Sequence, residues 1–419
     1  MDAMTIIFFI SLLIILVGAF FKKIQNVSIT EPLLALSLGV ILGPAVLNLI
    51  QIIDSPTQFY ILKVACQFTI AMALMATALR LPSHIFRKNA TTLSILVIFG
   101  MLLMWVLASG VFYLLMPNLG IFECLLLGAI ITPTDPVVAS TLITGKKAEK
   151  YLPAKLRNTL SFEAGVNDGL AFPIVFLALY LLNAEGGGDL GNWFVKILLY
   201  ESILCAILAY GVGYGCGYLL KKTHKAGYLN HKTLLSFSIA VALLLLSGFE
   251  LLQMNPVIAV FAGGFAFAKD ITANEDLEQE RIQETMERIT TVPVFFILGL
   301  MLPWQDWYAL GWTPVLIVVL ILLLRRLPAL LILMPFMPQF RKKIYSVLIM
   351  GWFGPIGVAA LYYAVLAKDK VNFDEVWIIP SLVVVASTVV HGLTSVPLEK
   401  LYHNTSEGTN ERENLENRT

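Results

Sequence analysis

Charged residues are scarce in this sequence: aspartate, glutamate, lysine and arginine make up 14% of its 419 residues, against roughly 25% in an ordinary soluble domain. This shortage argues against a typical soluble protein. The 29 basic and 28 acidic residues give a formal net charge of only +1. Because there is no excess of positive charge to attract a polyanion, no nucleic-acid partner is expected.

Cysteine is also rare. Cys66, Cys124, Cys205 and Cys216 fall inside apolar blocks and lack the short spacings of metal ligands. We therefore expect neither a disulfide framework nor a cofactor. Two signatures of hydrolytic enzymes, His-Glu-x-x-His and Gly-x-Ser-x-Gly, are absent from the sequence. An intramembrane enzyme thus remains only a remote alternative.

Long apolar blocks dominate what is present, since 58% of the residues are hydrophobic. A bilayer core of roughly 30 Å requires about 20 apolar residues per helix. The blocks predict an all-α polytopic membrane protein with about 13 transmembrane helices, the first retained as a span because no basic segment precedes it. The predicted spans are 4–21, 29–50, 58–80, 90–116, 120–144, 157–183, 192–220, 232–252, 255–269, 288–303, 312–335, 342–367 and 374–399.

The loop charges orient the chain. Lysines and arginines gather in one set of alternating loops, whereas the other set has only Lys63, Lys196, Lys368 and Lys370. By the positive-inside rule the rich set is cytoplasmic, which places the N-terminus outside and the C-terminus in the cytoplasm. We predict a transmembrane domain over residues 1–400 and a short, disordered polar tail over 401–419.

Thirteen spans divide into six, one and six, and a single linking span inverts the second six relative to the first. Pro32 and Pro256 open the second and ninth spans, and each is followed seven residues later by a glycine, Gly39 or Gly263. Spans five and twelve both contain proline and glycine in mid-membrane. Inverted repeats with paired discontinuous helices are typical of secondary transporters. We predict a six-helix inverted repeat that contains two discontinuous helices.

Few ionisable residues lie deep in these spans, and such residues normally mark ion or proton pathways. They are Asp135, Glu163, Asp168, Arg325 and Arg326. Asp135 stands between Pro133 and Pro136, which should interrupt the helix and leave carbonyls such as that of Thr134 unpaired. Asp135 would then offset the positive N-terminus of the helix that follows it. A simple proline kink with a capping aspartate is the alternative.

The sixth span carries two carboxylates with different surroundings. On a helix Glu163 and Asn167 share a face, whereas Asp168 points about 140° away from Glu163. We expect Glu163 to pair with an arginine, because a guanidinium in the membrane needs a partner. Asp168 has no obvious cationic neighbour, and a buried carboxyl group can exchange protons near neutral pH. One acid that holds either a monovalent cation or a proton is the minimum for an antiporter.

Thr132–Pro136 and Glu163–Gly169 resemble the cation/proton antiporter superfamily, specifically its Asn-Asp branch of sodium/proton antiporters. Two further stretches, Gly351–Val358 and His391–Thr394, are similar to fungal plasma-membrane sodium/proton antiporters and their bacterial relatives. With Arg325–Pro328, these motifs extend along the whole chain.

The resemblance implies a homodimer in the bilayer, with a core of spans about 90–183 and 312–399 and a dimer domain of the remaining spans. In the core, the two discontinuous helices, spans five and twelve, would cross and hold the ion site. It implies that Asp168 carries the cation and the proton, supported by Asn167 and Asp135. Thr134 would lend an oxygen to the cation. Glu163 would pair with Arg326 in preference to Arg325. The implied activity is electroneutral exchange of Na⁺ or Li⁺ for H⁺, with K⁺/H⁺ exchange as the alternative and an ion channel as a remote one.

Some positions depart from the family pattern. Ala164 stands where many prokaryotic relatives have serine, and the third span offers Gln67 and Thr69 where some have an acid. Cation selectivity is therefore less closely defined than the fold. His391 is interpreted as a hydrogen-bonded packing residue in preference to a pH sensor.

Overall fold

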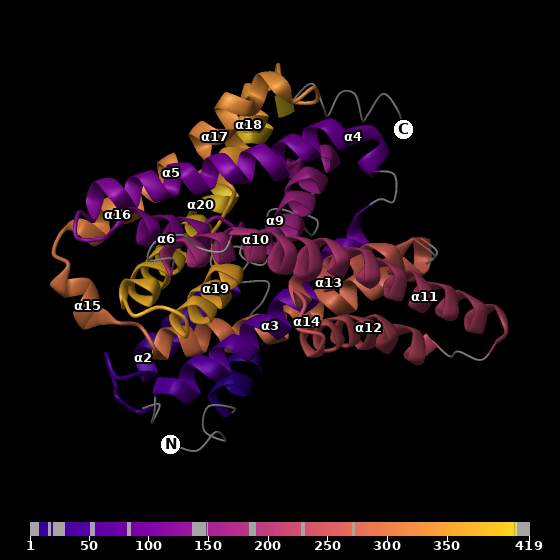
Figure 1. Ribbon diagram of the computed structural model, residues 1–419. Helices are drawn as coiled ribbons and strands as arrows, with labels where there is room; N and C mark the ends of the chain where they lie inside the picture. The colour runs from indigo at the N-terminus through magenta and orange to yellow at the C-terminus, as the bar shows by residue number, and fades with distance from the viewer. Residues whose placement is uncertain are drawn as a thin grey trace.

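The computed structural model describes residues 8–15, 18–19, 30–50, 55–81, 85–135, 148, 150–183, 190–227, 231–269, 273–405 and 407–408. Within these ranges the chain is helical and contains no strand (Figure 1). This confirms the predicted all-α class.

Helices follow the predicted spans, with breaks in some of them. Their bounds are α2 Glu31–Leu42, α3 Ser55–Arg80, α4 Ile85–Ser94, η1 Ile95–Gly100, α5 Met101–Leu115, α6 Ile121–Ile130, α9 Ala154–Leu182, α10 Leu190–Asn192, η2 Trp193–Leu204, α11 Cys205–Lys225, α12 His231–Leu251, α13 Pro256–Ala268, α14 Ala273–Leu300, α15 Trp304–Ala309, α16 Thr313–Leu324, α17 Leu327–Leu333, η3 Met334–Phe336, α18 Ile344–Trp352, α19 Val358–Lys368 and α20 Glu375–His403. The π-helical segments η1 and η2 are continuous with their α-helical neighbours.

Six helical runs of the described chain are long and apolar enough to cross a bilayer. They are Pro56–Arg80, Asn89–Leu115, Ala154–Leu182, Leu190–Lys225, Thr313–Phe336 and Glu375–His403. Shorter apolar helices, such as α6, α13 and α19, account for further predicted spans. The first span is described only in part, so the count of thirteen stays a prediction.

Two helix ends differ from the predicted spans. Helix α2 stops at Leu42 instead of continuing toward residue 50, because Gly43 and Pro44 form a helix stop. Helix α14 begins at Ala273, well before the predicted start at 288. Its first half is rich in glutamate, glutamine and arginine, which favour helix although they are too polar for a membrane window.

A third interrupted span was not predicted. The helix of span eleven breaks at Arg325 and Arg326, between α16 and α17. Pro328 lies in the first turn of α17, and a proline there disfavours continuous helix through the preceding residues. Because of this break, the directions of the two arginine side chains are not set by a regular helix.

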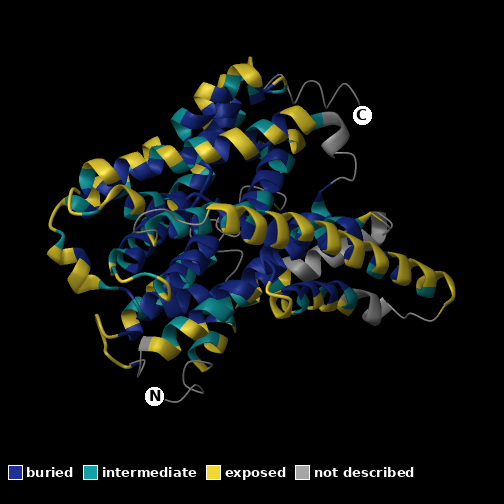
Figure 2. Ribbon diagram, viewed as in Figure 1, coloured by how far each residue is buried: buried dark blue, intermediate teal, exposed yellow. Residues whose placement is uncertain are grey.

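The helices pack into two groups. One group contains α2, α3 and α11–α14, and the other contains α5, α6, α9 and α16–α20. Helices α9 and α19 connect the groups through contacts with α3 and α13. In Figure 1, α11 and α12 extend to one side while α5, α16, α17 and α18 lie on another. Figure 2 shows that α11 is exposed along most of its length, whereas α19 is largely buried.

Glycines set the closest contacts inside the first group. A methyl group at Gly39 would overlap the Phe296 carbonyl and lie 3.0 Å from the Gly299 Cα atom of α14. A methyl group at Gly213 of α11 would overlap the backbone of Gly263 in α13. Gly39 and Gly263, the two glycines at matching positions in the sequence, are thus both sites where helix backbones touch.

Replacing Gly213 with alanine is expected to destabilise the protein by about 1–3 kcal/mol, the usual effect of overpacking. The added methyl group meets backbone, which cannot rotate away. Thermal unfolding of the purified protein in detergent measures the change. Gly215→Ala on the same helix is the control, because open space surrounds that position. Equal unfolding temperatures for the two variants would contradict the packing described here.

The start of the C-terminal tail is ordered, contrary to the prediction. Helix α20 continues to His403, and Glu407 caps the N-terminal end of α18. Its carboxylate accepts hydrogen bonds from the Tyr345 and Ser346 backbone N–H groups at 3.0 and 2.8 Å. Residues 409–419 lie outside the described part of the chain.

Candidate ion-binding site

The interruptions of spans five and twelve meet in the protein interior. Helix α6 ends at Ile130 and α18 ends at Trp352, so both predicted breaks are confirmed. The Asp135 N–H donates to the Pro355 carbonyl at 2.8 Å, and the Val358 N–H donates to the Asp135 carboxylate. Asp135 therefore caps α19, on the other broken span. The helix predicted to follow Asp135 lies outside the described residues.

Three glycines at every third position make this meeting possible. A methyl group at Gly351 would lie 2.6 Å from the Leu327 side chain. One at Gly354 would overlap the Arg326 side chain, and one at Gly357 would overlap the Asp135 carboxylate. The Gly351–Val358 motif thus provides space for groups from two other segments, the break of span eleven and the break of span five.

Arg325 joins the carbonyl ends of the two broken helices. Its Nη1 donates to the carbonyls of Ile131 and Thr132 at 2.7 and 2.8 Å, and more weakly to that of Pro133 at 3.3 Å. Its Nη2 donates to the Gly354 carbonyl. The guanidinium therefore offsets the negative C-terminal ends of both α6 and α18. The next carbonyl, that of Thr134, is not one of its acceptors.

Glu163 pairs with Arg326, the arginine favoured from the sequence. The Arg326 Nη1 and Nη2 atoms donate to the two Glu163 oxygens at 2.5 and 2.8 Å, and Nε donates to the Met350 carbonyl at 2.7 Å. Both side chains are buried, with exposures of 2% and 1%. Each arginine thus has a separate set of partners, which resolves the ambiguity between Arg325 and Arg326.

Asn167 fixes Thr134 from two sides. The Asn167 Nδ2 donates to the Thr134 hydroxyl oxygen at 2.7 Å, and the Thr134 backbone N–H donates to Asn167 Oδ1 at 3.2 Å. Both polar atoms of the amide are therefore engaged. The side chain orients the unwound segment of span five against α9.

Asp168 has a side-chain oxygen that is available for a ligand. Its Oδ1 is buried and has no hydrogen-bond partner among the described residues. The carboxylate lies close enough to Asp135 for the two to interact electrostatically. The Tyr363 hydroxyl of α19 donates to the Asp168 backbone carbonyl at 2.5 Å. The helix is thus fixed through its backbone while the acid group stays available.

His391 holds the break in span twelve together with Ser387. The Ile356 N–H donates to the Ser387 hydroxyl oxygen at 2.8 Å, and this hydroxyl lies 3.1 Å from His391 Nδ1. On the other side, His391 Nε2 lies 2.9 Å from the Trp352 carbonyl. His391 Nδ1 also lies 2.9 Å from the Ser387 carbonyl, so both ring nitrogens contact backbone carbonyl oxygens. These contacts favour the packing interpretation.

The polar residues of the third span are engaged elsewhere. Gln67 Nε2 donates to the Glu250 carboxylate at 2.9 Å, and the Thr69 hydroxyl donates to the Ala65 carbonyl of its own helix. Ala164 is buried beside the site and adds no oxygen. Nothing in the residue pattern indicates that Arg325 binds carbonyls or that Tyr363 contacts Asp168.

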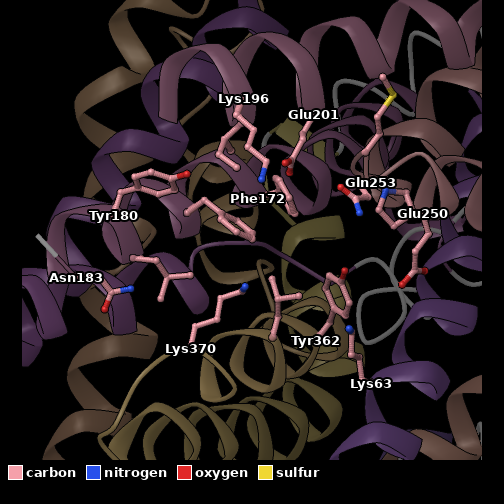
Figure 3. A pocket seen from close by; sticks show the side chains of 16 residues that line it. Lys63, Phe172, Tyr180, Asn183, Lys196, Glu201, Glu250, Gln253, Tyr362 and Lys370 are labelled. Carbon is pink, nitrogen blue, oxygen red and sulfur yellow. The ribbon is translucent and has the colours of Figure 1, made fainter. Parts of the chain in front are cut away.

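A cavity of about 750 Å³ opens near the site, and we call it the vestibule (Figure 3). It is lined by Lys63, Lys196 and Lys370, which are three of the four lysines in the sparsely charged set of loops, and by Glu201 and Glu250. Lys196 and Lys370 both interact electrostatically with Glu201. Phe172 and Tyr362 also line the vestibule; Phe172 follows Asp168 by four residues in α9, and Tyr362 precedes Tyr363, whose hydroxyl contacts the Asp168 carbonyl.

The chain matches a family model described as sodium/hydrogen exchanger, transmembrane, over residues 9–400. Na(+)/H(+) antiporter 2 of Zygosaccharomyces rouxii is 30% identical over 364 residues, covering 85% of this chain and 45% of that protein. The Na(+)/H(+) antiporter of Saccharomyces cerevisiae is 27% identical over 399 residues, covering 88% of this chain and 40% of that protein. The chain spans about half the length of these relatives.

The fold is also similar to a solved structure. The sodium proton antiporter MjNhaP1 from Methanocaldococcus jannaschii superposes with a TM-score of 0.68 over 95% of this chain and 97% of the other. Sequence identity is 19%, so the likeness concerns the fold. Together with the family match it confirms the resemblance that the motifs indicated.

Proposed function

The chain belongs to the transmembrane sodium/hydrogen exchanger family, and we propose that it exchanges Na⁺ or Li⁺ for H⁺ across a membrane by alternating access. The observation that carries this proposal is the Asp168 carboxyl group, which is 2% exposed and has an oxygen without a hydrogen-bond partner among the described residues. A buried acid in this condition requires a proton or a cation. Family membership favours a transporter over an intramembrane enzyme or a channel.

In this proposal Asp168 holds the cation and the proton in turn, so that each excludes the other. The Thr134 carbonyl is a second oxygen for the cation, since Arg325 binds the three carbonyls before it and not this one. Oxygen ligands suit a hard monovalent cation. Asn167 positions Thr134, and Asp135 holds the break of span twelve in place. Glu163, Arg326 and Arg325 are structural.

One titrating carboxylate favours electroneutral exchange of one cation for one proton. Loading Asp168 with either ion gives the moving part the same net charge, so the membrane potential does no work on it. The moving part in this proposal is the core of spans 90–183 and 312–399. The remaining spans form the stationary dimer domain of a homodimer, in agreement with the two packing groups.

The proposed location is the plasma membrane, or the inner membrane of a bacterium. The N-terminus lies outside and the C-terminus in the cytoplasm, as the loop charges favour. In this orientation the vestibule, with Lys63, Lys196 and Lys370, opens to the outside.

Proteoliposomes loaded with a pH-sensitive dye test the activity. Addition of Na⁺ or Li⁺ should move protons, and an imposed membrane voltage should not change the rate. K⁺ should have a much weaker effect at the same concentration. A response to K⁺ alone would replace the proposed substrate, and a voltage-dependent rate would contradict electroneutral exchange.

A further inference from the structure

Helix α9 lacks one of its backbone hydrogen bonds just after Asp168. Pro173 lies inside this helix and has no N–H group. The carbonyl of Gly169, four residues earlier, therefore lacks its normal helical donor. Inside a membrane such a carbonyl needs another partner. The exposed acceptor is adjacent to Asp168 in the sequence.

Asn255 provides that partner from another helix. Its Nδ2 donates to the Gly169 carbonyl at 3.1 Å. Its Oδ1 accepts from the N–H groups of Val257 and Ile258 at 2.9 and 3.2 Å, and so caps α13. Asn255 is fully buried. One side chain thus ties the start of α13 to the helix that carries Asp168.

The remaining contact between α9 and α13 is apolar. A methyl group at Gly169 would lie 2.7 Å from the Ile258 side chain, and one at Gly165 would lie 2.6 Å from the Phe261 ring. These two glycines are one turn apart and give α9 a smooth face. Sliding one helix along such an apolar face costs less free energy than breaking a hydrogen bond between two buried groups.

The vestibule lies beside the Asn255–Gly169 hydrogen bond. Phe172, one turn after Asp168, lines it, and so does Pro256, the neighbour of Asn255. Glu201 lines it as well, and its backbone carbonyl accepts from the Asn255 N–H at 3.1 Å. Asp168 is not among the lining residues. The Asn255–Gly169 hydrogen bond therefore adjoins the lining of the vestibule, and the vestibule does not reach Asp168.

We propose that Asn255 is a positioning residue of the exchange cycle: its amide holds α9 against α13, and the vestibule reaches Asp168 only after its hydrogen bond to the Gly169 carbonyl breaks. The inference rests on the proposed function. Release leaves the Gly169 carbonyl to be satisfied by vestibule water or by the transported cation. The Tyr363 bond to the Asp168 carbonyl joins α19 to α9 and does not involve Asn255.

Two variants break this hydrogen bond from opposite sides. Asn255→Ser keeps a good helix cap, but a serine hydroxyl is too short to reach both α13 and α9. Pro173→Ala leaves Asn255 intact and restores an N–H group that competes for the Gly169 carbonyl. Neither variant changes Asp168 or its surrounding oxygen atoms. Asn183→Ser is the matched control, because Asn183 is an exposed residue of the same cavity.

The reactivity of Cys205 reports whether the hydrogen bond between Asn255 and the Gly169 carbonyl is broken. Its buried thiol donates to the Asn255 carbonyl at 3.2 Å, one helical turn after Glu201. In a full-length chain with Cys66, Cys124 and Cys216 replaced by alanine, an impermeant maleimide added outside should label Cys205 slowly. Both variants should label about fivefold faster, the population change expected for one ordinary hydrogen bond. They should also lower the external Na⁺ concentration that gives half-maximal exchange, whereas Asn183→Ser changes neither quantity.

Wild-type labelling rates in both variants would overturn the proposal. If Asn255→Ser unfolds, Pro173→Ala decides the question alone. Labelling does not depend on transport, so a wild-type protein that fails to exchange cations refutes the proposed function separately. Faster labelling of Cys205 in both variants, with no change in the external Na⁺ concentration for half-maximal exchange, would also overturn the role of Asn255 in the exchange cycle.

Discussion

Asp168→Asn is expected to abolish cation-dependent proton movement in dye-loaded proteoliposomes, down to the level of liposomes without protein. Asparagine has nearly the same shape as aspartate, but its amide neither takes up a proton near neutral pH nor supplies a negative charge to a cation. The fold should persist, because Asp168 contacts Tyr363 through its backbone carbonyl and not through its carboxylate. Loss of activity would therefore reflect the missing acid.

The control is Asp306→Asn, which removes an exposed carboxylate from α15. This variant should exchange cations at the wild-type rate. Thermal unfolding in detergent should give similar midpoints for the wild type and both variants. Exchange retained by Asp168→Asn would contradict the proposed carrier, whatever the stability of the protein.

Arg326→Ala is expected to destabilise the protein by about 3–5 kcal/mol, the usual result of leaving one member of a buried ion pair without its partner. Glu163 would keep a charge in the protein interior without its two hydrogen bonds from Arg326. The Met350 carbonyl would lose its donor as well. The thermal midpoint should fall much more than the half-maximal Na⁺ concentration changes.

Two further variants sharpen this test. Arg288→Ala breaks the exposed ion pair with Glu31 and should have an effect of no more than about 1 kcal/mol. A double replacement, Arg326→Met with Glu163→Gln, removes both charges and should recover much of the stability lost in Arg326→Ala. An unchanged midpoint in Arg326→Ala would count against a structural role for the pair.

Local signals explain why the broken helices were predictable. Pro133, Pro136 and the glycines of Gly351–Val358 act on their own backbone, so their effect is visible in the sequence. The Glu163–Arg326 pair was also accessible, because a charge in the membrane requires a partner of opposite sign. Asn255 and Pro256, which open the ninth predicted span, form the N-terminal cap and the first turn of α13, so this helix start was also visible in the sequence.

The contacts to backbone carbonyls could not be predicted in the same way. Arg325 donates to Ile131 and Gly354, and a carbonyl is present in every residue and so leaves no mark in the sequence. The same holds for the Gly169 carbonyl, which Pro173 exposes but only tertiary packing brings to Asn255. The early start of α14 was missed because its first half lies outside any apolar window.

The glycine contacts among α2, α11, α13 and α14 bear on which parts of the molecule can move. At Gly39 and Gly213 one helix meets the main chain of another, and main chain has no rotamers with which to make way. Helix α9 instead meets the side chains of Ile258 and Phe261 first, with the Ile258 main chain farther away, at 3.3 Å from a methyl group placed at Gly169. In the proposed exchange cycle, we therefore expect the helix that carries Asp168 to move along the α9–α13 surface, with the glycine-packed helices as the fixed frame.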